Sequence, residues 1–185
     1  MRDDILRETR ERMQKAVQHF TDELRGVRTG RAAPGLVEGI RVNYYGSLTP
    51  LKQLATISIP EPRQIVIKPF DPSVAGEVEK AIQKSDLGIT PQADGKLIRL
   101  NLPPMSQEQR DKTVARVKEM AEECRVSVRN IRRDGNRRAE QAGKDKILPE
   151  DDVKSLQAEI QEQTRKSEKE IDEVLKSKSE EIRSL

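Results

Sequence analysis

VARVKEMAEECRVSVRNIRRDGNRR, residues 114–138, decides the fold of this chain. Its apolar residues recur at intervals that alternate between three and four: Val114, Val117, Ala121, Cys124, Val128 and Ile131. This spacing predicts a long α-helix whose apolar seam packs along other helices. The helix is expected to begin after Ser106, where Glu108 and Gln109 can reach back to form a capping box. The pattern lasts until Gly143.

The same period occurs near both ends of the chain. In the N-terminal segment, apolar residues stand seven apart at Leu6, Met13, Phe20 and Val27. This pattern predicts a helix that runs to about Thr29, before Gly30 and Pro34 stop it. A third helix is predicted from Pro149, with a seam from Val153 to Ile182. Because a single amphipathic helix cannot bury its own stripe, the three segments predict a three-helix bundle.

Between the first two helices the helical period disappears, and most of the prolines and glycines of the chain lie there. Short alternating runs predict strands at Ile40–Tyr45, Ala55–Ile59, Gln64–Pro69 and Leu97–Leu102. One short helix is predicted over Pro72–Lys84, capped by Asp71 or Ser73. The fold class is therefore α+β with two domains, in which a small β/α/β domain (30–104) interrupts a long three-helix bundle (1–29 and 105–185).

Two chain crossings join the predicted domains. Their residues are Thr29, Gly30 and Arg31 in the first crossing and Pro103, Pro104 and Met105 in the second. Paired crossings with glycine on one and proline on the other indicate a hinge of limited bending, and a fixed elbow is the alternative.

The composition limits the classes of function. Charged residues make up 36% and aromatic residues 2% of the chain, which suits a helical bundle with a narrow aliphatic core. The single cysteine, Cys124, excludes an intrachain disulfide and lies on the apolar seam. No apolar run approaches the ~20 residues that cross a bilayer, and no signal peptide is visible. We expect a cytoplasmic protein that does not bind a membrane.

Enzyme signatures are missing from the sequence. The only histidine, His19, lies beside seam residues, and no histidine–cysteine cluster has metal-ligand spacing. Neither a P-loop nor a nucleophile elbow occurs. We therefore expect no catalytic activity, no cofactor and no metal.

Positive charge is concentrated on the central helix, where residues 125–138 contain six arginines and one acid. Arg125, Arg129 and Arg132 share one face beside the seam. Arginine matches phosphate oxygens with paired donors, so this edge predicts contact with a nucleic-acid backbone. Pairing of these arginines with the third helix, where 11 acids outnumber 7 basic residues over 147–185, is the alternative. A coiled-coil adaptor or assembly protein is the alternative function.

Four motifs carry a resemblance that covers essentially the whole chain. They are ELRGVRTGRA (23–32), VNYYGSLTPLKQLATISI (42–59), DGKLIRLNLPP (94–104) and VRNIRRDGNR (128–137). In this order and spacing they closely resemble the bacterial ribosome recycling factor family. The resemblance implies an L-shaped monomer near the dimensions of a tRNA, with its two domains on a two-strand hinge that matches the two crossings.

The resemblance also implies a function and site residues. Members of the family bind large-subunit rRNA and, with the GTPase elongation factor G, split the post-termination ribosome and release mRNA and tRNA. Carried over position by position, Arg132 is the foremost rRNA-contact candidate, Arg129 and Arg28 come next, and Arg133 follows.

Overall fold

The computed structural model describes residues 1–184, which divide into two compact units. Unit 1 comprises Met1–Leu24 and Val114–Glu181, and its regular structure is all helical. Unit 2 comprises Arg25–Thr113 together with residues 182–184, and it contains all the strands of the described chain. The predicted mixture of long helices and a small sheet domain is confirmed.

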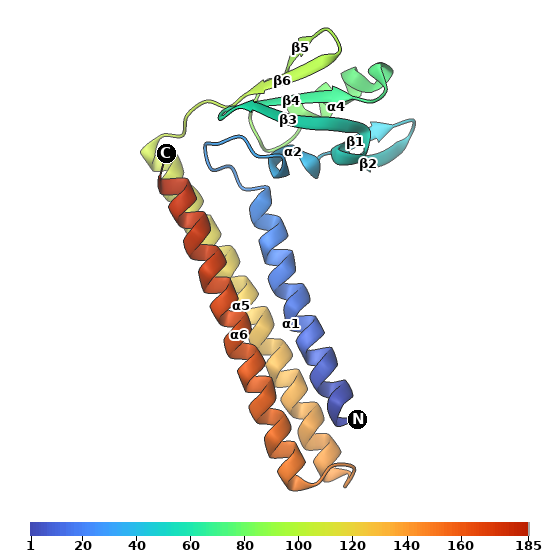
Figure 1. The fold of residues 1–185 in the computed structure, drawn as a ribbon, viewed down its shortest axis with the longest axis vertical. Helices are drawn as coiled ribbons and strands as arrows, with labels where there is room; N and C mark the ends of the chain where they lie inside the picture. Colours follow the sequence, from blue (N-terminus) through green and yellow to red (C-terminus); the bar gives the residue numbers. More distant parts are fainter. Residues whose placement is uncertain (185) are drawn as a thin grey trace. The chain divides into compact units, whose positions relative to one another are not determined.

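Unit 1 is built on α1 (Arg2–Arg25), α5 (Gln107–Lys144) and α6 (Glu150–Arg183), which lie side by side (Figure 1). Polar contacts give their directions. Arg12 meets Asp134 and Glu8 meets Arg138, so α1 and α5 are antiparallel. α6 turns back along α5, and Gln157 donates a hydrogen bond to Glu140 across this pair. The result is the predicted bundle.

Most of the predicted seam positions form the core of the bundle, but Leu6 and Val27 of the first seam are only partly buried. All six seam residues predicted on α5 are buried, and Gly135, Ala139 and Ala142 extend that seam. From α1 and α6 the buried residues are Ile5, Thr9, Met13, Val17, Phe20, Leu24, Leu156, Ile160, Thr164, Ser167, Ile171, Ser179 and Ile182. Only one of these side chains is aromatic, so the core is narrow and aliphatic.

The helix ends follow the expected local chemistry, with one exception. Ser106 Oγ accepts from the backbone N–H of Gln109 (3.2 Å), and Gln109 Oε1 accepts from the backbone N–H of Ser106 (3.0 Å), which completes the predicted capping box. The prediction that the first helix reaches about Thr29 is wrong, because α1 ends at Arg25. Gly26 follows directly, and glycine is a poor helix former.

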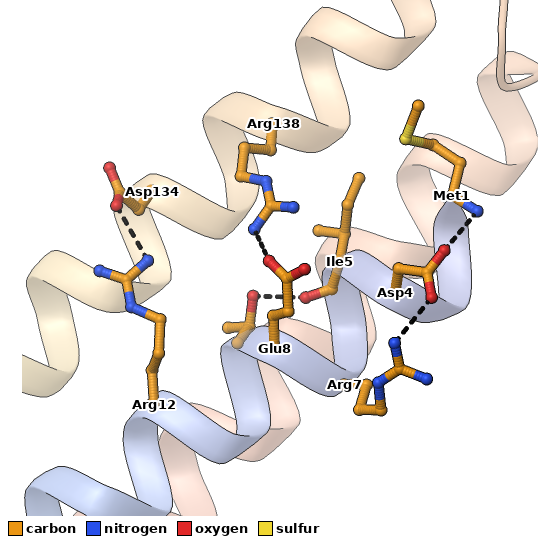
Figure 2. A network of polar contacts seen from close by, with 9 residues as sticks. Met1, Asp4, Ile5, Arg7, Glu8, Arg12, Asp134 and Arg138 are labelled. Carbon is orange, nitrogen blue, oxygen red and sulfur yellow. Dashed lines mark hydrogen bonds and ion pairs between the residues drawn. The ribbon is translucent and has the colours of Figure 1, made fainter.

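Two ion pairs on the surface connect α1 to α5 (Figure 2). Arg12 Nη1 lies 3.1 Å from Asp134 Oδ2, and Arg138 Nη1 lies 2.5 Å from Glu8 Oε2. The spacing of four residues on each helix brings both pairs to one line of contact. Both pairs are about half exposed, so they add modestly to the antiparallel register that the buried seam sets.

Unit 2 contains a hairpin and a four-stranded antiparallel sheet with strand order β3-β4-β6-β5. Its strands are β1 (Arg41–Tyr44), β2 (Ser47–Pro50), β3 (Ala55–Glu61), β4 (Gln64–Pro69), β5 (Gln92–Asp94) and β6 (Leu97–Asn101). Its helices are α2 (Gly35–Glu38), α3 (Leu51–Leu54), the 3₁₀ turn η1 (Pro72–Val74) and α4 (Ala75–Gln83). The four predicted strands and the helix within Pro72–Lys84 are present, and no end lies more than two residues from its predicted position. β2, β5, α2 and α3 were not predicted.

A single apolar core holds unit 2 together. Val78 and Ile82 of α4 are fully buried with sheet residues such as Ile65 and Ile98. Asp71 accepts from the backbone N–H of Ser73 (2.9 Å), as predicted for the start of this helical segment. The core includes Leu102, so the sheet anchors the chain up to the second crossing.

Within residues 1–184, no helix is both long enough and apolar enough to cross a membrane.

Gly135 lies where α5 packs tightly against α1 and α6 in unit 1. A Cβ atom at this position would lie 2.9 Å from Thr9 Oγ1 and 3.2 Å from Ile160 Cδ1. We expect Gly135→Ala to lower the free energy of unfolding by about 1–3 kcal/mol through overpacking, measured by urea denaturation. Gly76→Ala is the control, because a Cβ there meets nothing within 4 Å. Replacing Thr9 by Ala in the Gly135→Ala background should recover part of the lost unfolding free energy. If the effects of the two substitutions on the unfolding free energy were strictly additive, the proposed contact would be contradicted.

Cys124 lies on the seam, and its thiol contacts the carbonyl oxygen of Ala16 at 3.5 Å. Burial raises the pKa of the Cys124 thiol from 9.0 to about 11. The reactive thiolate is then about 100-fold rarer near pH 8 than for an ordinary thiol. Alkylation of the folded protein should be slow at pH 8 and should rise with pH up to about 11. Equal rates before and after denaturation in urea would contradict this assignment.

Candidate nucleic-acid interface

The seam of α5 fixes the direction in which each arginine points. Val128 and Ile131 are buried against the other two helices, so the residues next to them in the helical turn lie at the rim of the bundle. Arg125 and Arg132 contact α6, Arg129 shares their face of α5, and Arg138 contacts α1. The six arginines therefore do not share one environment.

Two of the six arginines pair with carboxylates on the neighbouring helices of the bundle. Arg125 bridges Asp172 of α6 at 2.5 Å and Glu122 of its own helix at 3.1 Å, and its side chain is only 23% exposed. Arg138 pairs with Glu8 of α1 (Figure 2). Pairing with the acidic third helix, the alternative considered for the arginine edge, thus applies to Arg125.

Arg132 and Arg133 have only neutral partners among the described residues. Arg132 Nη1 donates to the amide oxygen of Gln161 at 3.3 Å, and Arg133 Nη2 donates to the amide oxygen of Asn130. An amide oxygen accepts a hydrogen bond but carries no net charge. The positive charge of both guanidinium groups is therefore not balanced by a hydrogen-bonded carboxylate.

Arg129 and Arg137 have carboxylate partners that they share with other arginines. Arg129 pairs with Glu122, which also binds Arg125. Arg137 lies 4.0 Å from Asp134, which Arg12 also contacts, and its side chain is 80% exposed. Hydrogen bonds from Arg129 and then Arg125 hold the pKa of Glu122 below its usual range.

We call Arg129, Arg132, Arg133 and Arg137 the arginine strip. Two shared carboxylates cannot neutralise these four cations, so the strip has a positive excess. Three of its members were predicted as rRNA contacts, and Arg137 was not. The helical spacing of Arg133 and Arg137 is the signal in the sequence that places Arg137 beside the predicted residues.

The fourth predicted contact, Arg28, belongs to unit 2. Its Nη2 donates to the carbonyl oxygen of Pro103 at 2.6 Å, and its Nε is buried without a hydrogen-bond partner in the described structure. Arg28 thus links the two crossings, which are irregular over residues 26–34 and 102–106. We call these ranges the first and second connections.

The predicted hinge residues lie in these connections. Gly30 has a φ of 94°, a left-handed conformation that side-chain-bearing residues rarely adopt. Pro103, Pro104 and Met105 precede α5 without regular structure. The turn between β3 and β4 bonds to both connections: Pro62 O accepts from Ala32 N–H and Arg63 O accepts from Leu102 N–H, each at 2.8 Å.

The chemistry available to the strip is recognition of anions. Guanidinium groups donate paired hydrogen bonds to phosphate oxygens but take no part in proton transfer near neutral pH. Within residues 1–184, no group of three histidine, cysteine or carboxylate side chains has the arrangement of a metal site.

Comparison with known proteins gives one consistent result. The ribosome recycling factor family model matches residues 20–182. The ribosome-recycling factor of Carboxydothermus hydrogenoformans is 50% identical over 182 residues, covering 98% of each chain. That of Rhodopirellula baltica is 58% identical over 137 residues, covering 74% of each.

Solved structures agree with the sequences. A solution structure of a ribosome recycling factor has a TM-score of 0.81 at 40% identity, covering 100% of this chain and 98% of the other. A second has a TM-score of 0.70 at 38% identity and covers 98% of both chains. It is the T. thermophilus ribosome recycling factor, described with E. coli elongation factor G bound to the E. coli post-termination complex. The extent and level of these matches show that the chain belongs to the ribosome recycling factor family.

Proposed function

We propose that this chain is a translation factor of the cytoplasm that recycles ribosomes after termination. In this proposal it binds large-subunit rRNA and acts with elongation factor G to split the post-termination complex, releasing mRNA and tRNA. The observation that carries the proposal is the arginine strip, whose charge exceeds what the neighbouring carboxylates neutralise, on a helix of a ribosome recycling factor.

Binding of rRNA by the strip follows from its charge and its rigidity. The guanidinium groups of Arg132 and Arg133 donate hydrogen bonds to neutral amide oxygens. These bonds orient the guanidinium groups and leave their positive charge unbalanced. A phosphate oxygen is a stronger acceptor and would replace these amides. Release of counterions from the RNA adds a salt-dependent driving force. Arg28 keeps further donors beyond its bond to Pro103, so we retain it as a contact candidate.

The proposed action is mechanical rather than catalytic. In this scheme the strip fixes unit 1 on rRNA, and the GTPase elongation factor G supplies the energy that moves unit 2. The long helices of unit 1 share a continuous buried seam, and such a bundle bends little under load.

We also propose that the two connections form the hinge. The β3–β4 turn holds Ala32 and Leu102 by backbone hydrogen bonds, so those residues move with the sheet. Bending is then left to residues 26–31 and 103–106. These ranges contain the predicted hinge residues Thr29, Gly30, Arg31, Pro103, Pro104 and Met105.

The first test of this function removes one guanidinium group from the strip. Arg132→Gln should weaken binding to large ribosomal subunits by about 1–3 kcal/mol, because one charge-assisted contact is lost. Arg165→Gln on α6, where the side chain is 70% exposed, is the matched control and should bind as the parent protein does. Co-sedimentation with large subunits across a salt series measures the affinity of both variants. For Arg132→Gln, the slope of log affinity against log salt concentration should be shallower by about one.

Circular dichroism must show intact helices in both variants. Unchanged affinity of Arg132→Gln, or equal losses in Arg132→Gln and Arg165→Gln, would contradict the assigned role of the strip.

The second test concerns the hinge. Arg28→Ala removes the side-chain bond between the two connections, so units 1 and 2 should tumble more independently of each other. Backbone ¹⁵N relaxation measures this as diverging rotational correlation times for the two units. Arg41→Ala on β1 removes an exposed arginine of the same unit and should leave both times unchanged. If Arg28→Ala behaves like Arg41→Ala, the bond to Pro103 does not restrain the hinge.

A further inference from the structure

Unit 2 contains a cavity of about 470 Å³ where the two connections meet the β3–β4 turn. Its lining residues are Thr29, Gly30, Arg31, Pro62, Arg63, Pro104, Met105 and Arg110. The backbone bonds from Ala32 to Pro62 and from Leu102 to Arg63 hold these segments around the space. Three parts of the chain, distant in sequence, thus build one site.

The walls of this cavity are mainly apolar. Pro62, Pro104 and Met105 supply hydrocarbon and thioether surface, and Gly30 contributes no side chain. The volume falls within the range of about 300–1,000 Å³ that is typical of small-molecule sites. Apolar walls of this size favour a ligand with a flat ring system or a short chain.

The charged residues at the cavity all have the same sign. Three arginines line it and no acid does. Arg31 and Arg63 are exposed, and neither side chain makes a hydrogen bond or ion pair with any other residue of the range 1–184. Both guanidinium groups are therefore available to an anion at the mouth of an apolar space.

We propose that this cavity binds a small anionic amphiphile, free in solution. Its apolar body would contact Met105 and the two prolines, and its carboxylate, sulfonate or phosphate group would accept hydrogen bonds from Arg31 and Arg63. The ligand would touch both connections at once. This site is separate from the arginine strip and goes beyond the proposed function, which does not depend on it.

The four methionines make the site directly observable. Met105 lines the cavity, whereas Met1, Met13 and Met120 belong to unit 1. We would label the full-length protein with ¹³C-methyl methionine and titrate it with naphthalene-2-sulfonate. The Met105 signal should shift and saturate while the other three stay in place.

A neutral analogue and a bare anion separate the two parts of the recognition. Naphthalene-2-sulfonamide has nearly the same shape without the charge and should bind at least about five-fold more weakly. Inorganic sulfate has the charge without the apolar body and should not displace the naphthalene ligand at equal concentration. Equal affinity of the sulfonate and the sulfonamide would overturn the proposal, as would displacement by sulfate.

Two matched variants test the residues. Arg63→Gln keeps the backbone acceptor of the β3–β4 turn and should abolish the preference for the sulfonate over the sulfonamide. Arg41→Gln removes the same charge from β1, outside the cavity, and should preserve that preference. If both variants lost the preference for the sulfonate equally, net charge alone would explain the effect and the site would be overturned. Movement of all four methionine signals would overturn it as well.

Discussion

The structure depends on the mutual burial of three apolar seams, none of which can be covered by its own helix. Burying a side chain such as Ile160 or Phe20 stabilises the fold by about 1.5–3 kcal/mol, and both are removed from solvent here. Because the core has almost no aromatic side chains, its helices must approach closely, and Gly135 permits this. The seam also sets the rotation of α5, and that rotation decides which arginines reach the surface.

Charge is divided between two uses along α5. Arg125 and Arg138 connect α5 to α6 and α1, so their contribution belongs to the bundle. The strip instead relies on amide oxygens and on carboxylates that already serve another arginine. If every arginine of α5 were paired with a carboxylate, the outer face of the helix would carry no positive excess. If none were paired, the neighbouring guanidinium groups would repel one another. Interleaving the two kinds keeps the helix packed and its outer face positive.

Much of this arrangement was predictable from the sequence, because it depends on local rules. The alternating spacing located the α5 seam, and the Ser106 capping box and the Asp71 cap were visible as short motifs. β2 and β5 escaped prediction because neither strand has a buried residue and so neither shows alternation. The end of α1 at Arg25 was also missed, since the heptad spacing continues to Val27 after the helix has stopped. Arginine partners such as Asp172 and Glu8 are distant in sequence, so only the folded chain reveals which guanidinium groups they occupy.

Unit 1 is discontinuous in the chain, and this has a consequence for its biosynthesis. Its first helix is complete when residue 24 has been made, but its partners begin only at residue 114. At about 5–20 residues per second, α1 waits on the order of 10 seconds with its apolar stripe exposed. Unit 2 has most of its core in the interval and can fold first, whereas the α5–α6 hairpin forms later from neighbouring sequence. α1 is therefore the first helix to be translated but cannot be covered until its partner helices have been made, so its apolar stripe stays open to chaperones and to misassociation during that interval.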